Sequence, residues 1–156
     1  MLALIADSDI NIQQTLKAYV ERLSPQCEAI CFRDPMQLLK FWRVNKEDCA
    51  LVITPAVSNV GDGFKILNIV NNSQNVVPVF LTAQSINQEL KLLAQLRGAS
   101  GFLSKPLDYD AFKDEMNSWY IECADSMDTV CDMKCICTNC RWNKQQVSNK
   151  VLEGSL

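Results

Sequence analysis

Five of the eight cysteines of this chain fall within 123–140, and four of them form the pattern C-x₃-C-x-C-x₂-C. Four thiolates this close together can bind Zn²⁺ tetrahedrally or hold an iron–sulfur cluster. The spacing matches neither the paired C-x₂-C motifs of zinc ribbons nor the usual ferredoxin motif. A metal site is therefore one interpretation of Cys131, Cys135, Cys137 and Cys140. Two alternatives remain open: the cysteines are redox-active or disulfide-forming thiols, or they have no functional role.

The chain contains no histidine, which removes the commonest general base and a common metal ligand. The sequence also offers no Ser–His, Cys–His or paired-carboxylate constellation, so we expect a protein that is not an enzyme. The remaining cysteines, Cys27, Cys31 and Cys49, lie in apolar segments and are expected to be small buried hydrophobic residues.

Length and composition predict a single globular domain. The chain has 156 residues, of which 48% are hydrophobic and 21% are charged, with a formal net charge of −3. This balance does not predict a nucleic-acid-binding surface. The N-terminal apolar run is short and has no basic leader, and no segment approaches the roughly 20 apolar residues of a membrane span. We therefore expect a soluble, cytoplasmic protein.

Short apolar runs alternate with amphipathic segments along most of the chain. The expected strands lie at 2–6, 27–32, 49–54, 76–81 and 101–103. The expected helices follow Asp9, Asp34, Gly63, Ser85 and Asp108, and the fourth has its apolar positions at Leu90, Leu93 and Leu96. Five such units predict an α/β domain over 1–123, with a five-stranded, doubly wound parallel sheet. The cysteine-rich segment 124–156 is expected to be a separate appendage.

In an open parallel sheet, functional groups gather at the carboxyl ends of the strands. The side chains expected there are Asp7, Ser8, Asp9, Thr54, Pro55, Thr82 and Lys105.

These residues stand in four motifs whose order and spacing are fairly specific: ADSD ending at 9, LVITPAVSNVGDG at 51–63, VFLTA at 79–83 and GFLSKP at 101–106. The chain thereby resembles the CheY-like receiver domains of response regulators, with a flavodoxin-like (βα)₅ fold. The resemblance implies an acidic pair for Mg²⁺ at 7–8, a phosphoacceptor aspartate at 55, and a hydroxyl and a lysine at 82 and 105 that contact phosphoryl oxygens.

The phosphoacceptor position is the main departure from the family pattern. Pro55 has no nucleophilic oxygen, Ser8 replaces the second acid, and Asp9 should point elsewhere. The pocket formed by Asp7, Ser8, Pro55, Thr82 and Lys105 is therefore expected to be degenerate, and Mg²⁺ is not expected in it. Lys105 is expected to form a salt bridge with Asp7 in preference to binding a ligand, and Asp62 to serve the turn.

The leading hypothesis is a pseudo-receiver that acts in signalling by binding a protein partner, independently of phosphorylation. The resemblance implies an interaction surface, and a possible homodimer, on the fourth helix, fifth strand and fifth helix, about 85–123. Phe102 in this region is expected to be a core or interface residue. The alternative hypothesis is a metal or redox sensor whose input is the C-terminal cysteines.

Overall fold

The computed structural model describes residues 1–57, 63–74, 77–85 and 87–125, and the expected appendage lies outside them except for its first two residues. Five parallel strands form one sheet in the order β2-β1-β3-β4-β5. The strands are β1 (Leu2–Ala6), β2 (Glu28–Phe32), β3 (Cys49–Pro55), β4 (Val79–Ala83) and β5 (Gly101–Ser104). The helices are α1 (Ile10–Leu23), α2 (Pro35–Val44), α3 (Gly63–Asn71), α4 (Gln88–Leu96) and α5 (Tyr109–Asp125).

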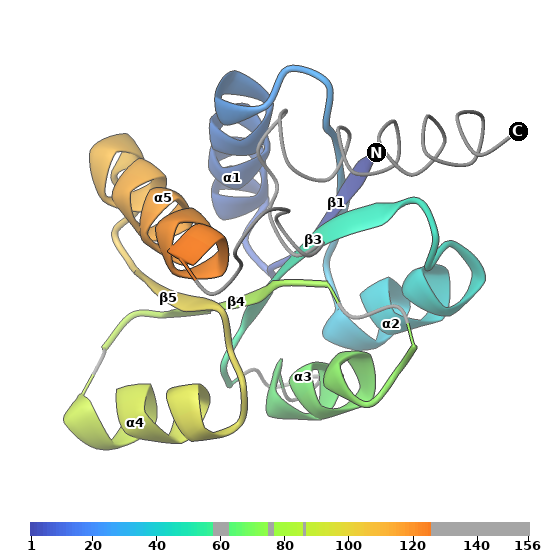
Figure 1. The fold of residues 1–156 in the computed structure, drawn as a ribbon. Helices are drawn as coiled ribbons and strands as arrows, with labels where there is room; N and C mark the ends of the chain where they lie inside the picture. The colour runs from blue at the N-terminus through green and yellow to red at the C-terminus, as the bar shows by residue number, and fades with distance from the viewer. Residues whose placement is uncertain (58–62, 75–76, 86, 126–156) are drawn as a thin grey trace, which may run out of the picture.

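Helices cover both faces of the sheet, as predicted for a doubly wound fold. Figure 1 shows α1 and α5 on one face and α2, α3 and α4 on the other. Alternate residues of a strand point to opposite faces, and the central strand β3 is buried at every position. Ile53 packs with α1 and α5, whereas its neighbour Val52 packs with α2 and α3. None of the described helices is long and apolar enough to cross a bilayer.

Local capping signals set several of the helix ends as the sequence indicates. The Asp9 side chain accepts a hydrogen bond from the N–H of Asn11, and Asp34 caps α2 in the same way ahead of Pro35. Gly98 follows Arg97, the C-cap of α4, and adopts a φ of +86°, which glycine tolerates best. These residues explain why the units alternate at the expected spacing.

Two expected boundaries were wrong. Asn87, not Ser85, caps α4, because its side chain accepts from the N–H of Leu90. β4 begins three residues later than expected and follows Pro78, which has no N–H to donate to a ladder. The fifth helix agrees with the expectation: α5 begins at Tyr109, directly after Asp108, and continues to Asp125.

Side chains cover backbone groups on both open edges of the sheet. On β2, Lys17 Nζ donates to the carbonyl of Ala29 at 3.1 Å. On β5, Glu115 Oε1 accepts from the N–H of Phe102 at 2.9 Å. A Cβ atom at Gly101 would lie 2.7 Å from that Glu115 oxygen, so glycine leaves the space through which the carboxylate reaches the edge. Charged side chains at sheet edges hinder pairing with a strand of another molecule.

The apolar face of the fourth helix was predicted incorrectly. Ala94 is the one residue of α4 that is buried, and Leu90 is half-buried beside it. Leu93 and Leu96, which were expected to face the core, are 40% and 77% exposed. The side of α4 that faces the sheet differs from the predicted side, because the small Ala94 side chain lets the helix approach the sheet there.

Candidate functional site

The five residues of the expected pocket come together at the carboxyl edge of the sheet. They line one cavity of about 390 Å³, together with residues of the β4–α4 connection and Leu90. Pro55 and Thr82 are register partners on β3 and β4, so their side chains stand next to each other on the same face. Thr54, also expected at this edge, does not line the cavity; it is register partner to Leu81 and is fully buried.

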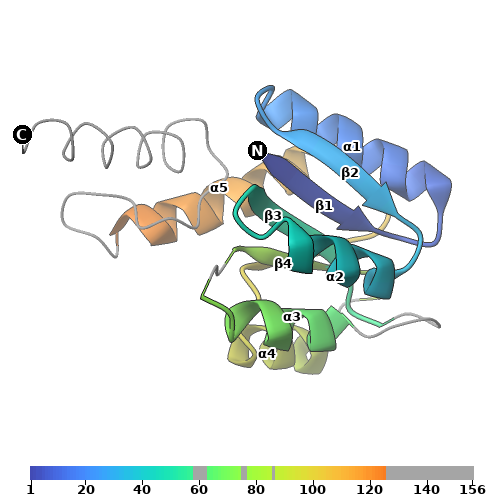
Figure 2. The ribbon, with the colours of Figure 1, turned by 90° about the vertical axis from the view of Figure 1, so that its right-hand side faces the viewer.

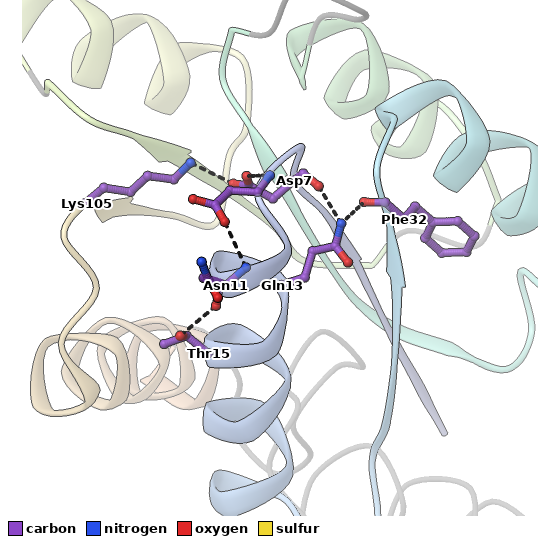
Figure 3. Close-up of polar contacts among 7 residues, drawn as sticks. Asp7, Asn11, Gln13, Thr15, Phe32 and Lys105 are labelled. Atoms are coloured by element: carbon purple, nitrogen blue, oxygen red, sulfur yellow. Dashed lines mark hydrogen bonds and ion pairs between the residues drawn. The ribbon is translucent and has the colours of Figure 1, made fainter.

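Asp7 and Lys105 form a direct ion pair across this cavity. Lys105 Nζ lies 2.6 Å from Asp7 Oδ2, and the side chains are 16% and 3% exposed respectively. The other carboxylate oxygen, Oδ1, accepts the N–H of Asp9 at 2.9 Å. Both oxygens of Asp7 are therefore engaged within the protein, as Figure 3 shows. The salt bridge expected from the sequence is present.

The other two residues of the ADSD motif do not complete an acidic pair. Ser8 is exposed at the rim of the cavity. The Asp9 carboxylate is used as the N-cap of α1, where it accepts the N–H of Asn11 at 2.8 Å. Asp62 lies outside the described residues, so its expected role in the turn stays a prediction. Its neighbour Gly63 begins α3, where an added Cβ would lie 2.0 Å from the carbonyl oxygen of Pro55.

Gln13 supports the site and was missed by the sequence analysis. Its Nε2 donates to the carbonyl of Asp7 at 2.6 Å and to that of Phe32 at 3.3 Å, which ties α1 to the ends of β1 and β2 (Figure 3). The residue is 4% exposed. The sequence could have indicated this role. Gln13 lies on the same side of the predicted helix as the apolar Leu16 and Val20, and a buried side-chain amide requires hydrogen-bond partners.

The hydroxyl of Thr82 is buried without a hydrogen-bond partner among the described residues. The residue is 1% exposed. The side chain next to it across the register is the ring of Pro55, which can neither accept nor donate a hydrogen bond. A buried hydroxyl without a partner costs about 1 to 3 kcal/mol of stability.

Replacing Thr82 with valine is expected to leave stability unchanged or to raise it by about 1 kcal/mol. The substitution keeps the shape and removes a hydroxyl that forms no hydrogen bond with the described protein groups. Urea denaturation followed by circular dichroism measures the effect, with Thr82→Ser, which keeps the hydroxyl but removes a buried methyl, as the comparison. A loss of more than about 1 kcal/mol in Thr82→Val would show that the hydroxyl has a stabilising partner.

The residues present do not fit a Mg²⁺ ion of the kind that receiver domains use. Mg²⁺ requires several oxygen ligands in octahedral geometry. Pro55 offers no side-chain oxygen, Ser8 offers only a hydroxyl, and both oxygens of Asp7 are already hydrogen-bonded. Within the described ranges, no three His, Cys, Asp or Glu side chains gather as metal ligands.

The cysteines divide between the core and the C-terminal segment. Cys131, Cys135, Cys137 and Cys140 lie outside the described residues, so the expected metal site stays a prediction. Cys27 and Cys49 are buried as expected, whereas Cys31 is half-buried. Burial raises the pKa of the Cys31 thiol, an effect that Lys17 partly opposes. The reactive thiolate is therefore less populated at Cys31 than in an ordinary cysteine.

The three-dimensional structure is similar to those of solved receiver domains. A response regulator receiver domain from Clostridium thermocellum matches with a TM-score of 0.68 and 20% identity, covering 81% of this chain and 98% of that one. The receiver domain of a DNA-binding response regulator from Colwellia psychrerythraea matches at 0.66 and 18%, covering 78% and 98%. Chemotaxis protein CheY4 of Vibrio cholerae matches at 0.64 and 19%, covering 75% and 96%.

The described domain thus has the fold of response regulator receiver domains. At the level of sequence, no family model matches the chain. No curated protein matches it significantly either. The likeness therefore concerns the fold alone, and the site must be interpreted from its own residues.

Proposed function

We propose that this chain is a receiver-like signalling protein that acts by binding a protein partner and does not depend on aspartyl phosphorylation. The observation that carries the proposal is Pro55, which lines the cavity beside Thr82 where the receiver pattern has its phosphoacceptor. A proline ring cannot attack a phosphoryl group, and neither Thr54 nor Ala56 would supply a carboxylate if the register shifted by one residue.

The ion pair between Asp7 and Lys105 supports the same proposal. In phosphoryl transfer a lysine stabilises charge that develops on the transferred group. Here the ammonium group of Lys105 lies 2.6 Å from the Asp7 carboxylate, in surroundings that exclude most solvent. Each charge neutralises the other, so the site has no strongly unpaired charge. A binding protein needs no reactive charge in this cavity, and the neutralised pair is compatible with such a role.

The experiment is an NMR titration of the ¹⁵N-labelled full chain with beryllofluoride and Mg²⁺, which together mimic a phosphorylated aspartate. We expect no saturable, site-specific shift of the amides at 7–9, 56–57, 82–85 and 105. Mg²⁺ alone and fluoride alone serve as controls, and a receiver domain with an intact acidic pair shows that the reagent is active. Saturable shifts confined to the cavity would contradict the proposal.

A further inference from the structure

Helices α2 and α3 carry positive charge and no carboxylate on their outer side. Of the helices that the structure describes, these are the two whose sequences contain no aspartate or glutamate. Lys40 and Arg43 on α2 and Lys65 on α3 are all exposed. Figure 2 shows the two helices next to each other on the same side of the sheet. We call Lys40, Arg43, Val44 and Lys65 the basic face.

The three cations of the basic face are not neutralised by their surroundings. None of them forms an ion pair with another residue in the described part of the chain. Acidic residues flank α2 only along the sequence: Asp34 caps the start of the helix with its carboxylate, and Glu47 and Asp48 come after its end. The outer side of α2 is therefore free to attract a negatively charged group.

The charge of the basic face is opposite to that of the whole chain, whose formal net charge is −3. On the other face of the sheet, α5 has exposed carboxylates at Asp110 and Asp114 and one basic residue, Lys113. An acidic partner is therefore repelled by the molecule as a whole and attracted by this face. The distribution of charge selects both the partner and the place where it docks.

An apolar side chain lies among these cations. Val44 is 84% exposed, which is the largest exposed fraction among the large hydrophobic residues that the structure describes. Lys40, Arg43 and Val44 have the i, i+3, i+4 spacing of neighbours on one side of a helix. The surface thus combines two cations with an apolar contact. It is complementary to a segment in which carboxylates surround an apolar residue.

We infer that the basic face docks an acidic, partly apolar segment of a partner protein. Duplex DNA is a poorer match, because specific DNA-binding proteins often contact about six to ten phosphates and this face offers three cations. A membrane surface is also a poorer match, because helices that bind it insert several bulky apolar residues and this face has one valine. The inference rests on the proposed function, because it adds a docking surface and a partner chemistry to the binding module.

The spacing and size of the basic face predict the form of the partner and its affinity. Lys40 and Arg43 lie one helical turn apart, which matches carboxylates at i and i+3 or i+4 of a partner helix. α2 has ten residues and α3 has nine, so each is only about 15 Å long. Such a face is smaller than the roughly 800 Å² that each partner contributes to a standard interface. We therefore expect a transient complex with a Kd on the order of 100 µM.

A titration with a defined acidic peptide tests the inference. The probe is a capped synthetic helix of about 16 residues with glutamates at i, i+3, i+4 and i+7 around a central leucine. In ¹⁵N NMR spectra of the full chain, we expect saturable shifts at amides 36–44 and 63–71 and none at 109–117. The Kd should rise at least about tenfold between about 50 mM and about 500 mM NaCl, because salt screens exposed charges.

A second peptide with glutamine at every glutamate position is the control for charge, and it should not bind. The inference would be overturned by the absence of saturable shifts at about 1 mM of the acidic peptide, or by equal binding of the glutamine peptide.

Charge reversal with a matched control tests the face itself. Lys40→Glu with Arg43→Glu should raise the Kd at least about twentyfold, because each change replaces attraction by repulsion. Both positions are exposed, and glutamate is a good helix former, so circular dichroism should show unchanged folding. Lys91→Glu with Lys113→Glu, at exposed positions on α4 and α5, changes the net charge equally and should alter the Kd less than about twofold. Equal weakening by the two double variants would overturn the inference.

Vesicles distinguish a protein partner from a membrane surface. The full chain should not co-sediment with vesicles that contain about 30% phosphatidylserine. Co-sedimentation that is lost in Lys40→Glu with Arg43→Glu would overturn the assignment to a protein segment. The beryllofluoride titration probes the cavity at the carboxyl edge of the sheet and not this face, so either proposal can fail alone.

Discussion

Replacing Lys105 with methionine is expected to lower the free energy of unfolding by about 3 kcal/mol, because it leaves a buried carboxylate without its counter-charge. The Asp7 side chain is 3% exposed, so solvent cannot take over the role of the ammonium group. Methionine keeps much of the apolar length of lysine, so most of the loss reports on the charge. Urea denaturation at neutral pH, followed by circular dichroism, measures the change.

The converse substitution is expected to cost less. In Asp7→Asn the side-chain oxygen can still accept the N–H of Asp9, and Lys105 lies closer to the rim, where its ammonium can reach water. We expect a loss of about 1 kcal/mol. The double variant Lys105→Met with Asp7→Asn should lose less than the sum of the single losses, because no unpaired buried charge remains.

An exposed ion pair provides the matched control. Lys17 and Glu21 lie 3.5 Å apart on α1, with side chains 39% and 40% exposed. Glu21→Gln removes this pair and keeps the contact of Lys17 with β2, so the change should stay below about 0.5 kcal/mol. If Lys105→Met cost no more than Glu21→Gln, the pair with Asp7 would not be a significant source of stability.

The second large effect is expected from restoring the acidic residues that receiver domains have. In the variant Ser8→Asp with Pro55→Asp, three carboxylates share the cavity with one lysine. Without a divalent cation, their mutual repulsion and burial should destabilise the fold by about 2 kcal/mol or more. Mg²⁺ that binds only the folded variant should add about 2.7 kcal/mol of stability at a hundredfold excess over its Kd.

The measurement is thermal unfolding with increasing Mg²⁺, with Ca²⁺-free buffer and matched ionic strength. The wild-type chain and the matched variant Ser8→Asn with Pro55→Asn should show no Mg²⁺-dependent rise in Tm, because neither supplies the missing carboxylates. An equal rise in the wild type would contradict the interpretation of the cavity as a degenerate site. No rise in the aspartate variant would show that positions 8 and 55 are not placed to share an ion with Asp7.

The sequence by itself determined the alternation of elements and therefore the fold class. Apolar runs and capping residues such as Asp9 and Asp34 act within a few positions, so their effect can be inferred from local spacing. The positions of the apolar runs also predicted that Pro55 lies at the end of β3 and that Lys105 follows β5. Where two nearby residues could cap the same helix, as Ser85 and Asn87 could for α4, the predicted start of the helix differed from the observed start by a few residues.

Only the tertiary structure decided how those residues meet. Lys105 and Asp7 are 98 positions apart, and the engagement of both Asp7 oxygens depends on how β1, α1 and β5 come together. The buried amide of Gln13 is likewise defined by carbonyls from two strands. Helix α4 has two apolar sides, one with Leu90 and Ala94 and the other with Leu92, Leu93 and Leu96. The first side faces the sheet, so the leucines of the second side are exposed. Periodicity shows that a helix has an apolar side, but the packing of its neighbours selects which side is buried.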